Sequence, residues 1–264
     1  LEIEMTGTQA RVLGTLGNPN VFAGFIMMLA AGTLAIAIYS KRLMRLAALA
    51  TYLTLTVAVV IATASRTGIV ALVVITGFIL TISMQGRARW SALFLMFIFL
   101  TAFLTLRQQA ADLRIINPRT RDLLIGQEGT VSAAVQSRSR LWERSLAEAK
   151  TSLLIGVGIK KKADHVTDNG YLFTLMTSGL LGLTAYLMML GILFGRGLKR
   201  FFTEADRSRR MLLAGTVTIL LTHAIFEMTG DFFWNISYGA IVAAFLGLLC
   251  GASAKTPQWR EARY

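Results

Sequence analysis

The sequence predicts an all-α, polytopic membrane protein: a bundle of transmembrane helices with one large outward loop. Three observations support this fold class. Of 264 residues, 55 % are hydrophobic and only 16 % are charged, which is fewer charges than a soluble domain of this length carries. Apolar runs of about 20 residues, enough to cross a bilayer, recur along the chain. Clusters of Lys and Arg separate several of these runs.

The apolar runs predict about seven spans within a single membrane domain, 1–264. The first begins at Gly-Asn-Pro-Asn, where Pro19 suits the first helical position and Asn18 the cap. The chain opens with Leu1 rather than Met and shows no signal peptide, so we expect a fragment that lacks N-terminal spans. The predicted spans are 19–39, 46–64, 67–84, 90–106, 169–194, 211–228 and 236–252.

The distribution of charge predicts the sidedness. Loops 40–45, 85–89 and 195–210 are rich in Lys and Arg, so the positive-inside rule places them in the cytoplasm. The 65–68 turn and the 107–167 loop, between spans 4 and 5, then lie outside. The net charge of +13 therefore reflects topology rather than nucleic-acid binding. One cysteine and two histidines give no disulfide framework and no protein-held metal, and we expect no cofactor.

The outward loop is itself basic. Residues 107–168 hold eleven Lys and Arg against seven Asp and Glu, which favours an anionic partner such as a phosphate, a diphosphate or a lipid headgroup. Within the loop, 139–152 has the pattern of an amphipathic helix, and a helix lying on the bilayer would show the same pattern. Its apolar face comprises Leu141, Trp142, Ser145, Leu146 and Ala149.

Five ionisable residues share the predicted outer side: Arg66, Arg138, Arg140, His165 and Asp168. Each has a plain structural reading, as a snorkelling arginine, a loop histidine or a helix-capping aspartate. Together they combine guanidinium groups that bind phosphate oxygens with a carboxylate or imidazole that accepts a proton. This combination suits transfer from a lipid diphosphate.

A second group lies within the sixth predicted span. His223 and Glu227 are four residues apart near its outer end, where they form either a helix–helix contact or an edge of the same site. Buried charges and discontinuous helices at mid-depth would instead indicate a transporter or flippase. A non-catalytic scaffold of a polysaccharide assembly complex is a further alternative, against which the outward arginines argue.

The order of the motifs resembles the bacterial O-antigen ligase and polymerase superfamily, over most of the chain. Each motif is short, and their order carries the resemblance. The matching pieces are Arg11 with Gly17–Asn20, then Ser65, Arg66 and Gly68, then Arg138, Trp142, Gly156 and Gly158, then Asp168 and Asn169, and finally Gly179–Gly182.

The resemblance implies an inverting, metal-independent glycosyltransferase with a GT-C-like fold in the bacterial inner membrane, with its active face periplasmic. Its donor would be a glycan linked to undecaprenyl diphosphate, and its acceptor a lipid- or glycan-linked hydroxyl, in lipopolysaccharide, capsule or exopolysaccharide synthesis. Membrane lipids are the other expected partners. Arg66 and Arg138 would hold the diphosphate, and Arg140 and Arg11 are further candidates for this contact.

The residue before Asn169 would be the base that takes the proton of the acceptor hydroxyl. Ligases of this superfamily typically carry His there, and this chain carries Asp168. Either Asp168 is the base, or His165 substitutes for it, or the chain is a polymerase-like member. The aspartate favours a polymerase or exopolysaccharide enzyme over a lipid A ligase.

Overall fold

The computed structural model describes residues 3–6, 9–12, 19–58, 66–84, 86, 90, 128–158, 169–228, 230, 239–240, 242–244, 247 and 251. The regular secondary structure within these ranges is helical apart from one hairpin, in which β1 (Ile3–Thr6) pairs antiparallel with β2 (Gln9–Val12). The hairpin departs from the predicted all-α class. Its sequence signal is the Gly-Thr pair between two short strand-forming runs.

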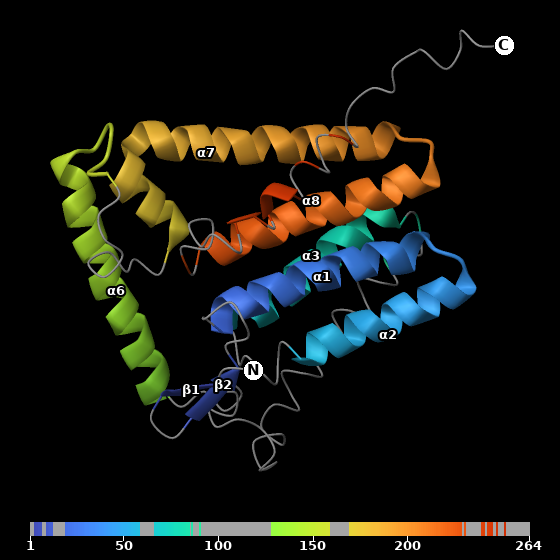
Figure 1. Cartoon of the computed structure of the whole chain (residues 1–264), viewed down its shortest axis with the longest axis horizontal. Helices are drawn as coiled ribbons and strands as arrows, with labels where there is room; N and C mark the ends of the chain where they lie inside the picture. Colours follow the sequence, from blue (N-terminus) through green and yellow to red (C-terminus); the bar gives the residue numbers. More distant parts are fainter. Residues whose placement is uncertain are drawn as a thin grey trace, which may run out of the picture.

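Five helices run alongside one another, and a sixth, α6 (Glu128–Thr151), lies across one end of them (Figure 1). Three helices of the described part are long and apolar enough to cross a membrane: Val21–Tyr39, Gly170–Thr203 and Arg207–Glu227. These confirm an integral membrane protein. Most of the predicted spans 90–106 and 236–252 lies outside the described residues. The five helices are α1 (Pro19–Tyr39), α2 (Arg42–Ala58), α3 (Arg66–Ser83), α7 (Gly170–Thr203) and α8 (Arg207–Glu227).

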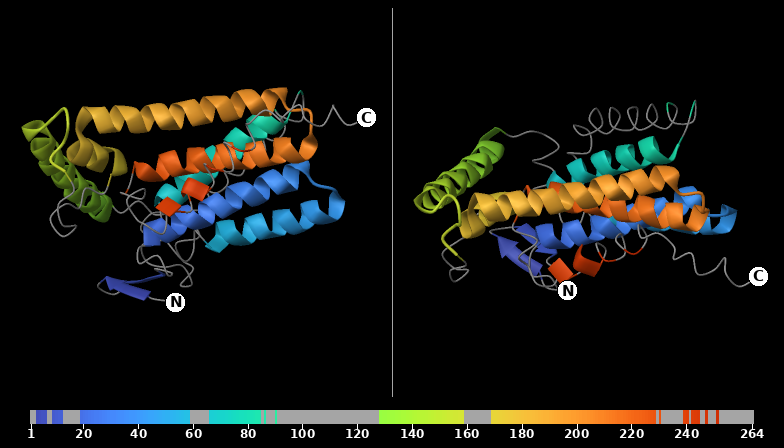
Figure 2. Two further views of the ribbon diagram at one scale, coloured as in Figure 1. Left: turned by 45° about the horizontal axis from the view of Figure 1, so that its top comes forward. Right: turned by 90° about the horizontal axis from the view of Figure 1, so that it is seen from above.

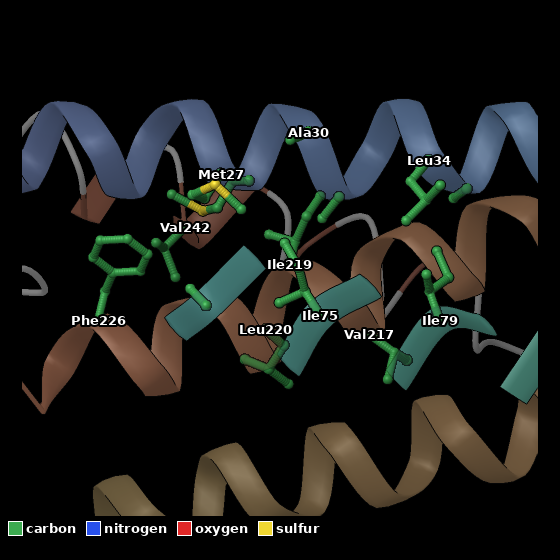
Figure 3. Packing of buried hydrophobic residues seen from close by; sticks show 14 of the residues in the cluster. Met27, Ala30, Leu34, Ile75, Ile79, Val217, Ile219, Leu220, Phe226 and Val242 are labelled. Carbon is green, nitrogen blue, oxygen red and sulfur yellow. The ribbon is translucent and has the colours of Figure 1, made fainter. Parts of the chain in front are cut away.

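The core forms where α1, α3 and α8 meet. Small residues allow α1 and α8 to pack closely, since a Cβ added to Gly215 would sit 3.4 Å from the Cβ of Ala35. On α3, Ala71, Ile75 and Ile79 recur every four residues and are fully buried. Figure 3 shows this interior, in which Met27 and Leu34 of α1 lie near α3 and α8 side chains.

The helix bundle has two distinct ends. The α1–α2 and α7–α8 connections lie at one end (Figure 2), where the Tyr39 and Phe201 rings meet edge to face at 6.4 Å. We call this the basic end. It contains Lys41, Arg42, Arg45, Arg200, Arg207, Arg209 and Arg210. We call the opposite end, where α7 begins and α8 ends, the Asn169 end. The two short connections that the sequence analysis placed on one side therefore do lie at the same end of the bundle.

Two helices differ from their predicted bounds in ways that matter for the site. Helix α6 begins at Glu128 rather than at 139, because the residues before Arg138 mix small and polar side chains with only two larger apolar ones, Val131 and Val135, which is a weak helix signal. Helix α7 begins at Gly170, as expected for a span from 169, but it is broken at Gly179, whose φ of 67° and ψ of −168° are not helical.

Candidate functional site

The start of α7 is fixed to the end of α8 by one side chain. Asn169 caps α7, because its Oδ1 accepts a hydrogen bond from the backbone N–H of Leu172 at 3.0 Å. Its Nδ2 donates to the backbone oxygen of Met228 at 3.3 Å. The reading of Asp168 as the helix cap was therefore wrong, because the side chain of Asn169 fills that role. Asp168 and His165 themselves lie outside the described residues, so their roles stay predictions.

A buried carboxyl group lies directly against the first residue of α7. Glu227 is 0 % exposed, and a Cβ built on Gly170 would overlap its carboxyl group. Only glycine leaves this space open. The hydroxyl of Tyr171 donates to the backbone oxygen of Ala224 at 2.8 Å, which adds a second connection between the two helices. The first turn of α7 therefore rests on the last turn of α8.

The predicted pair of His223 and Glu227 is confirmed as a contact and extends to a third residue. Nδ1 of His223 lies 3.8 Å from Oε1 of Glu227, and both side chains are fully buried. Nε2 of His223 lies 2.8 Å from the hydroxyl of Tyr186 on α7. The sequence analysis missed Tyr186. Its signal was weak, because a lone tyrosine in an apolar span shows no partner until the histidine 37 residues later is placed beside it.

The break in α7 is where the segment 152–158 docks. Backbone N–H groups of Val157 and Gly158 donate to the oxygens of Met176 and Thr177, at 2.9 and 3.0 Å. In the other direction, the N–H groups of Leu180 and Leu181 donate to the oxygens of Leu153 and Leu154, at 2.8 and 3.2 Å. The groups that the break removes from the helical ladder are thus paired with this segment.

Two glycines permit this backbone-to-backbone contact. Gly156 (φ 74°) and Gly179 (φ 67°) both adopt left-handed conformations that favour glycine. A Cβ on Gly156 would overlap the backbone of Thr177, and a Cβ on Gly179 would overlap that of Leu154. The Gly-x-Gly and Gly-Leu-Leu-Gly motifs are therefore the two halves of one joint.

That joint attaches α6, which carries three of the predicted site residues, to α7. Among the α6 side chains that the structure describes, from Arg138 to Thr151, Ser145 and Ala149 are buried, and Ala149 packs on Phe173 and Met176 of α7. Trp142 and Leu146 are 37 % and 43 % exposed, so only part of the predicted apolar face is covered. Arg138 is half-buried, and Arg140 is exposed.

Arg66 and Arg11 are placed by their backbone alone. Helix α3 begins at Arg66, so the predicted turn residue is the first residue of a helix. A cation at a helix N-terminus is electrostatically disfavoured, and both the guanidinium and the helix end attract anions. Arg11 lies opposite Glu4 in the hairpin register. Neither side chain is among those described.

The structure thus brings Asn169, Glu227 and His223 together and connects Trp142 and Arg138 to them through α6 and the joint. It does not describe how His165, Asp168 or the side chains of Arg66 and Arg11 lie relative to them. Within the described ranges, no group of three or more His, Cys, Asp or Glu residues could hold a metal ion.

Comparison with known proteins connects this arrangement to a family. No curated protein matches the chain. The family model described as O-antigen ligase matches residues 51–187, just over half of the chain. The matched region includes all of α3 and α6, the joint and the first half of α7 with Tyr186. It ends before α8, which supplies His223 and Glu227. This chain belongs to the O-antigen ligase family.

Proposed function

We propose that the chain is a membrane glycosyltransferase that moves or polymerises a glycan from undecaprenyl diphosphate onto an acceptor hydroxyl. The family match carries this proposal, because it covers the segments that hold Arg66, Arg138, Asp168 and Asn169. We further propose about seven spans in one GT-C-like membrane domain, with 107–167 outside the membrane. The reaction would then take place at the periplasmic face of a bacterial inner membrane.

The proposed reaction is an inverting displacement without a metal. The acceptor oxygen forms a bond to the anomeric carbon of the donor while the bond from that carbon to the diphosphate oxygen breaks. Asp168, or His165 in its place, takes the hydroxyl proton. Undecaprenyl diphosphate leaves, and its negative charge is met by Arg138 and Arg66, with Arg140 and Arg11 as further contacts. Trp142 and Asn169 support the two sides of the site.

The anchoring of α6 supports this division of roles. The joint attaches α6 to α7 through backbone hydrogen bonds. The position of α6, which carries Arg138, is therefore fixed relative to the first part of α7. Two lipid-linked substrates confined to one membrane surface would gain from such fixed positioning. The acceptor would be a lipid- or glycan-linked hydroxyl in lipopolysaccharide, capsule or exopolysaccharide synthesis.

The test uses the full protein in proteoliposomes with an undecaprenyl-diphosphate oligosaccharide and EDTA. We expect release of undecaprenyl diphosphate by the wild type and a loss of about a hundredfold or more for Arg138→Ala, Arg66→Ala and Asp168→Asn. Arg144→Ala is the matched control, since Arg144 is an exposed cation on the same helix. If Arg138→Ala keeps the wild-type rate expected for Arg144→Ala, Arg138 has no part in the mechanism.

A transporter or flippase is the second candidate, because α7 is discontinuous and His223 and Glu227 are buried within the bundle. The same proteoliposomes distinguish the two. A flippase would move the lipid-linked oligosaccharide across the bilayer without releasing undecaprenyl diphosphate, whereas a transferase would produce a glycosylated acceptor.

A further inference from the structure

Three buried polar side chains form a line between α7 and α8 inside the membrane-spanning part. Tyr186 contacts His223 at 2.8 Å, and His223 faces Glu227 at 3.8 Å. The Tyr186 ring also lies edge to face with the His223 ring and 6.1 Å from the Tyr171 ring. Ionisable groups are costly to bury in a membrane, so their presence in a bundle points to a task.

The line ends at the first residue of α7. The Glu227 carboxyl group fills the space beside Gly170, which follows Asn169 and Asp168 in the chain. The N-terminus of a helix carries partial positive charge and favours an anion. A carboxylate is therefore the side-chain group that best suits this position, and Nδ1 of His223, whose ring is held by the Tyr186 hydroxyl, lies 3.8 Å from it.

We propose that Glu227, oriented by His223 and Tyr186, is a positioning residue for glycan transfer: as a carboxylate it fixes the first turn of α7 and thereby the Asp168–Asn169 pair. This inference rests on the proposed function. Glu227 is fully buried, so it acts through the α7 backbone rather than on the substrate. The network sets where the base stands, whereas the arginines of α6 and α3 hold the donor.

Because Glu227 is assigned to positioning the base and the arginines to binding the donor, the proposal predicts which kinetic constant changes. Glu227→Gln keeps the size of the side chain but replaces an acceptor oxygen with an N–H donor at the helix N-terminus or beside His223. The base is displaced while the diphosphate contacts remain. We expect kcat to fall about ten- to a hundredfold, as for a small misplacement of a reacting group, with the donor KM within about twofold.

Two further variants separate charge from packing. Glu227→Asp keeps the carboxylate on a shorter side chain, so it should retain more activity than Glu227→Gln. Tyr186→Phe removes one hydroxyl and should lower kcat in the same direction by a smaller factor. Because it keeps the ring, this variant remains informative even if Glu227→Gln does not fold.

The chain offers a matched control for each. Glu204→Gln changes the other buried glutamate of the α7–α8 hairpin, at the basic end, where it pairs with Arg200 at 3.3 Å. Tyr52→Phe removes a hydrogen bond of 2.6 Å to Thr76 between α2 and α3. Both should leave kcat and KM at wild-type values.

The experiment measures kcat and donor KM for all five variants beside the wild type and Arg138→Ala. Lower kcat for Glu227→Gln and Tyr186→Phe, with both controls unchanged, supports the proposal. If Arg138→Ala is inactive but Glu227→Gln matches the wild type, or exceeds Glu227→Asp, the inference is overturned while the proposed function stands. If the wild type itself releases no undecaprenyl diphosphate, the proposed function fails and the inference fails with it.

Discussion

At the scale of single residues, Gly170 is a position where one added methyl group has no room. The space for a Cβ is occupied by the Glu227 carboxyl group, and the backbone oxygen of Gly230 lies 2.9 Å from the same point. Neither neighbour is the free end of an exposed side chain. A larger residue must therefore displace the end of α8 from the start of α7.

We expect Gly170→Ala to destabilise the protein by about 1–3 kcal/mol, the usual cost of overpacking a filled interior, and to lower transfer activity. Thermal unfolding in detergent, followed beside the transfer assay, measures both. Gly191→Ala is the control, because a Cβ there meets nothing within 4 Å and alanine favours the helix.

A second substitution makes this prediction sharper. Adding Glu227→Asp to Gly170→Ala withdraws the carboxyl group and should recover part of the lost stability. Recovery should be incomplete, because the Gly230 oxygen remains in place. Purely additive effects of the two substitutions would show that the carboxyl group and position 170 do not compete for space.

At the scale of elements, the joint between segment 152–158 and the break in α7 determines where α6 lies. Each partner supplies backbone donors and acceptors to the other, and each needs a glycine at the crossing. Either element without the other would leave polar backbone groups unpaired, which is costly away from water. A change that disrupts one motif is therefore expected to disrupt the other as well.

Gly156→Ala and Gly179→Ala should each separate the same joint. Each substitution places a Cβ on a left-handed backbone and against the opposite backbone. We therefore expect each to lower the free energy of unfolding by at least about 2 kcal/mol. The double variant should lose less than the sum of the two, because one contact cannot be broken twice. Unfolding temperatures of the two single variants and the double variant give the coupling, and full additivity would argue against a shared joint.

The elements also show what could be predicted from the sequence. The bounds of α1 were predicted at 19–39 because Pro19 suits a helix start and the apolar run is uninterrupted. The break at Gly179 could not be predicted, because the backbone groups that it leaves out of the helix are paired with residues 153–158, which lie outside α7. The same holds for Tyr186, whose role depends on a histidine from another helix. Local patterns predict helices, whereas these contacts depend on the packed bundle.

At the scale of the whole molecule, the two ends of the bundle differ in charge and in chemistry. Cationic side chains of the α1–α2 and α7–α8 connections gather at the basic end, and the Asn169 end holds the start of α7 with the joint and α6. By the positive-inside rule, we expect the basic end to lie in the cytoplasm. The two ends must lie on opposite sides of the membrane for the proposed reaction.

Labelling with a membrane-impermeant maleimide tests this orientation. In a Cys250→Ser background, we expect Ala147→Cys on α6 to react in intact cells and Lys41→Cys at the basic end to react only after permeabilisation. Both positions are exposed, so accessibility within the protein does not decide the result. If both cysteines react in intact cells, the two ends of the bundle do not lie on opposite sides of the membrane. The reverse pattern would place the Asn169 end, with Arg138 and the capped start of α7, in the cytoplasm. That result would exclude a periplasmic donor for this site, because the arginines would then face the wrong leaflet.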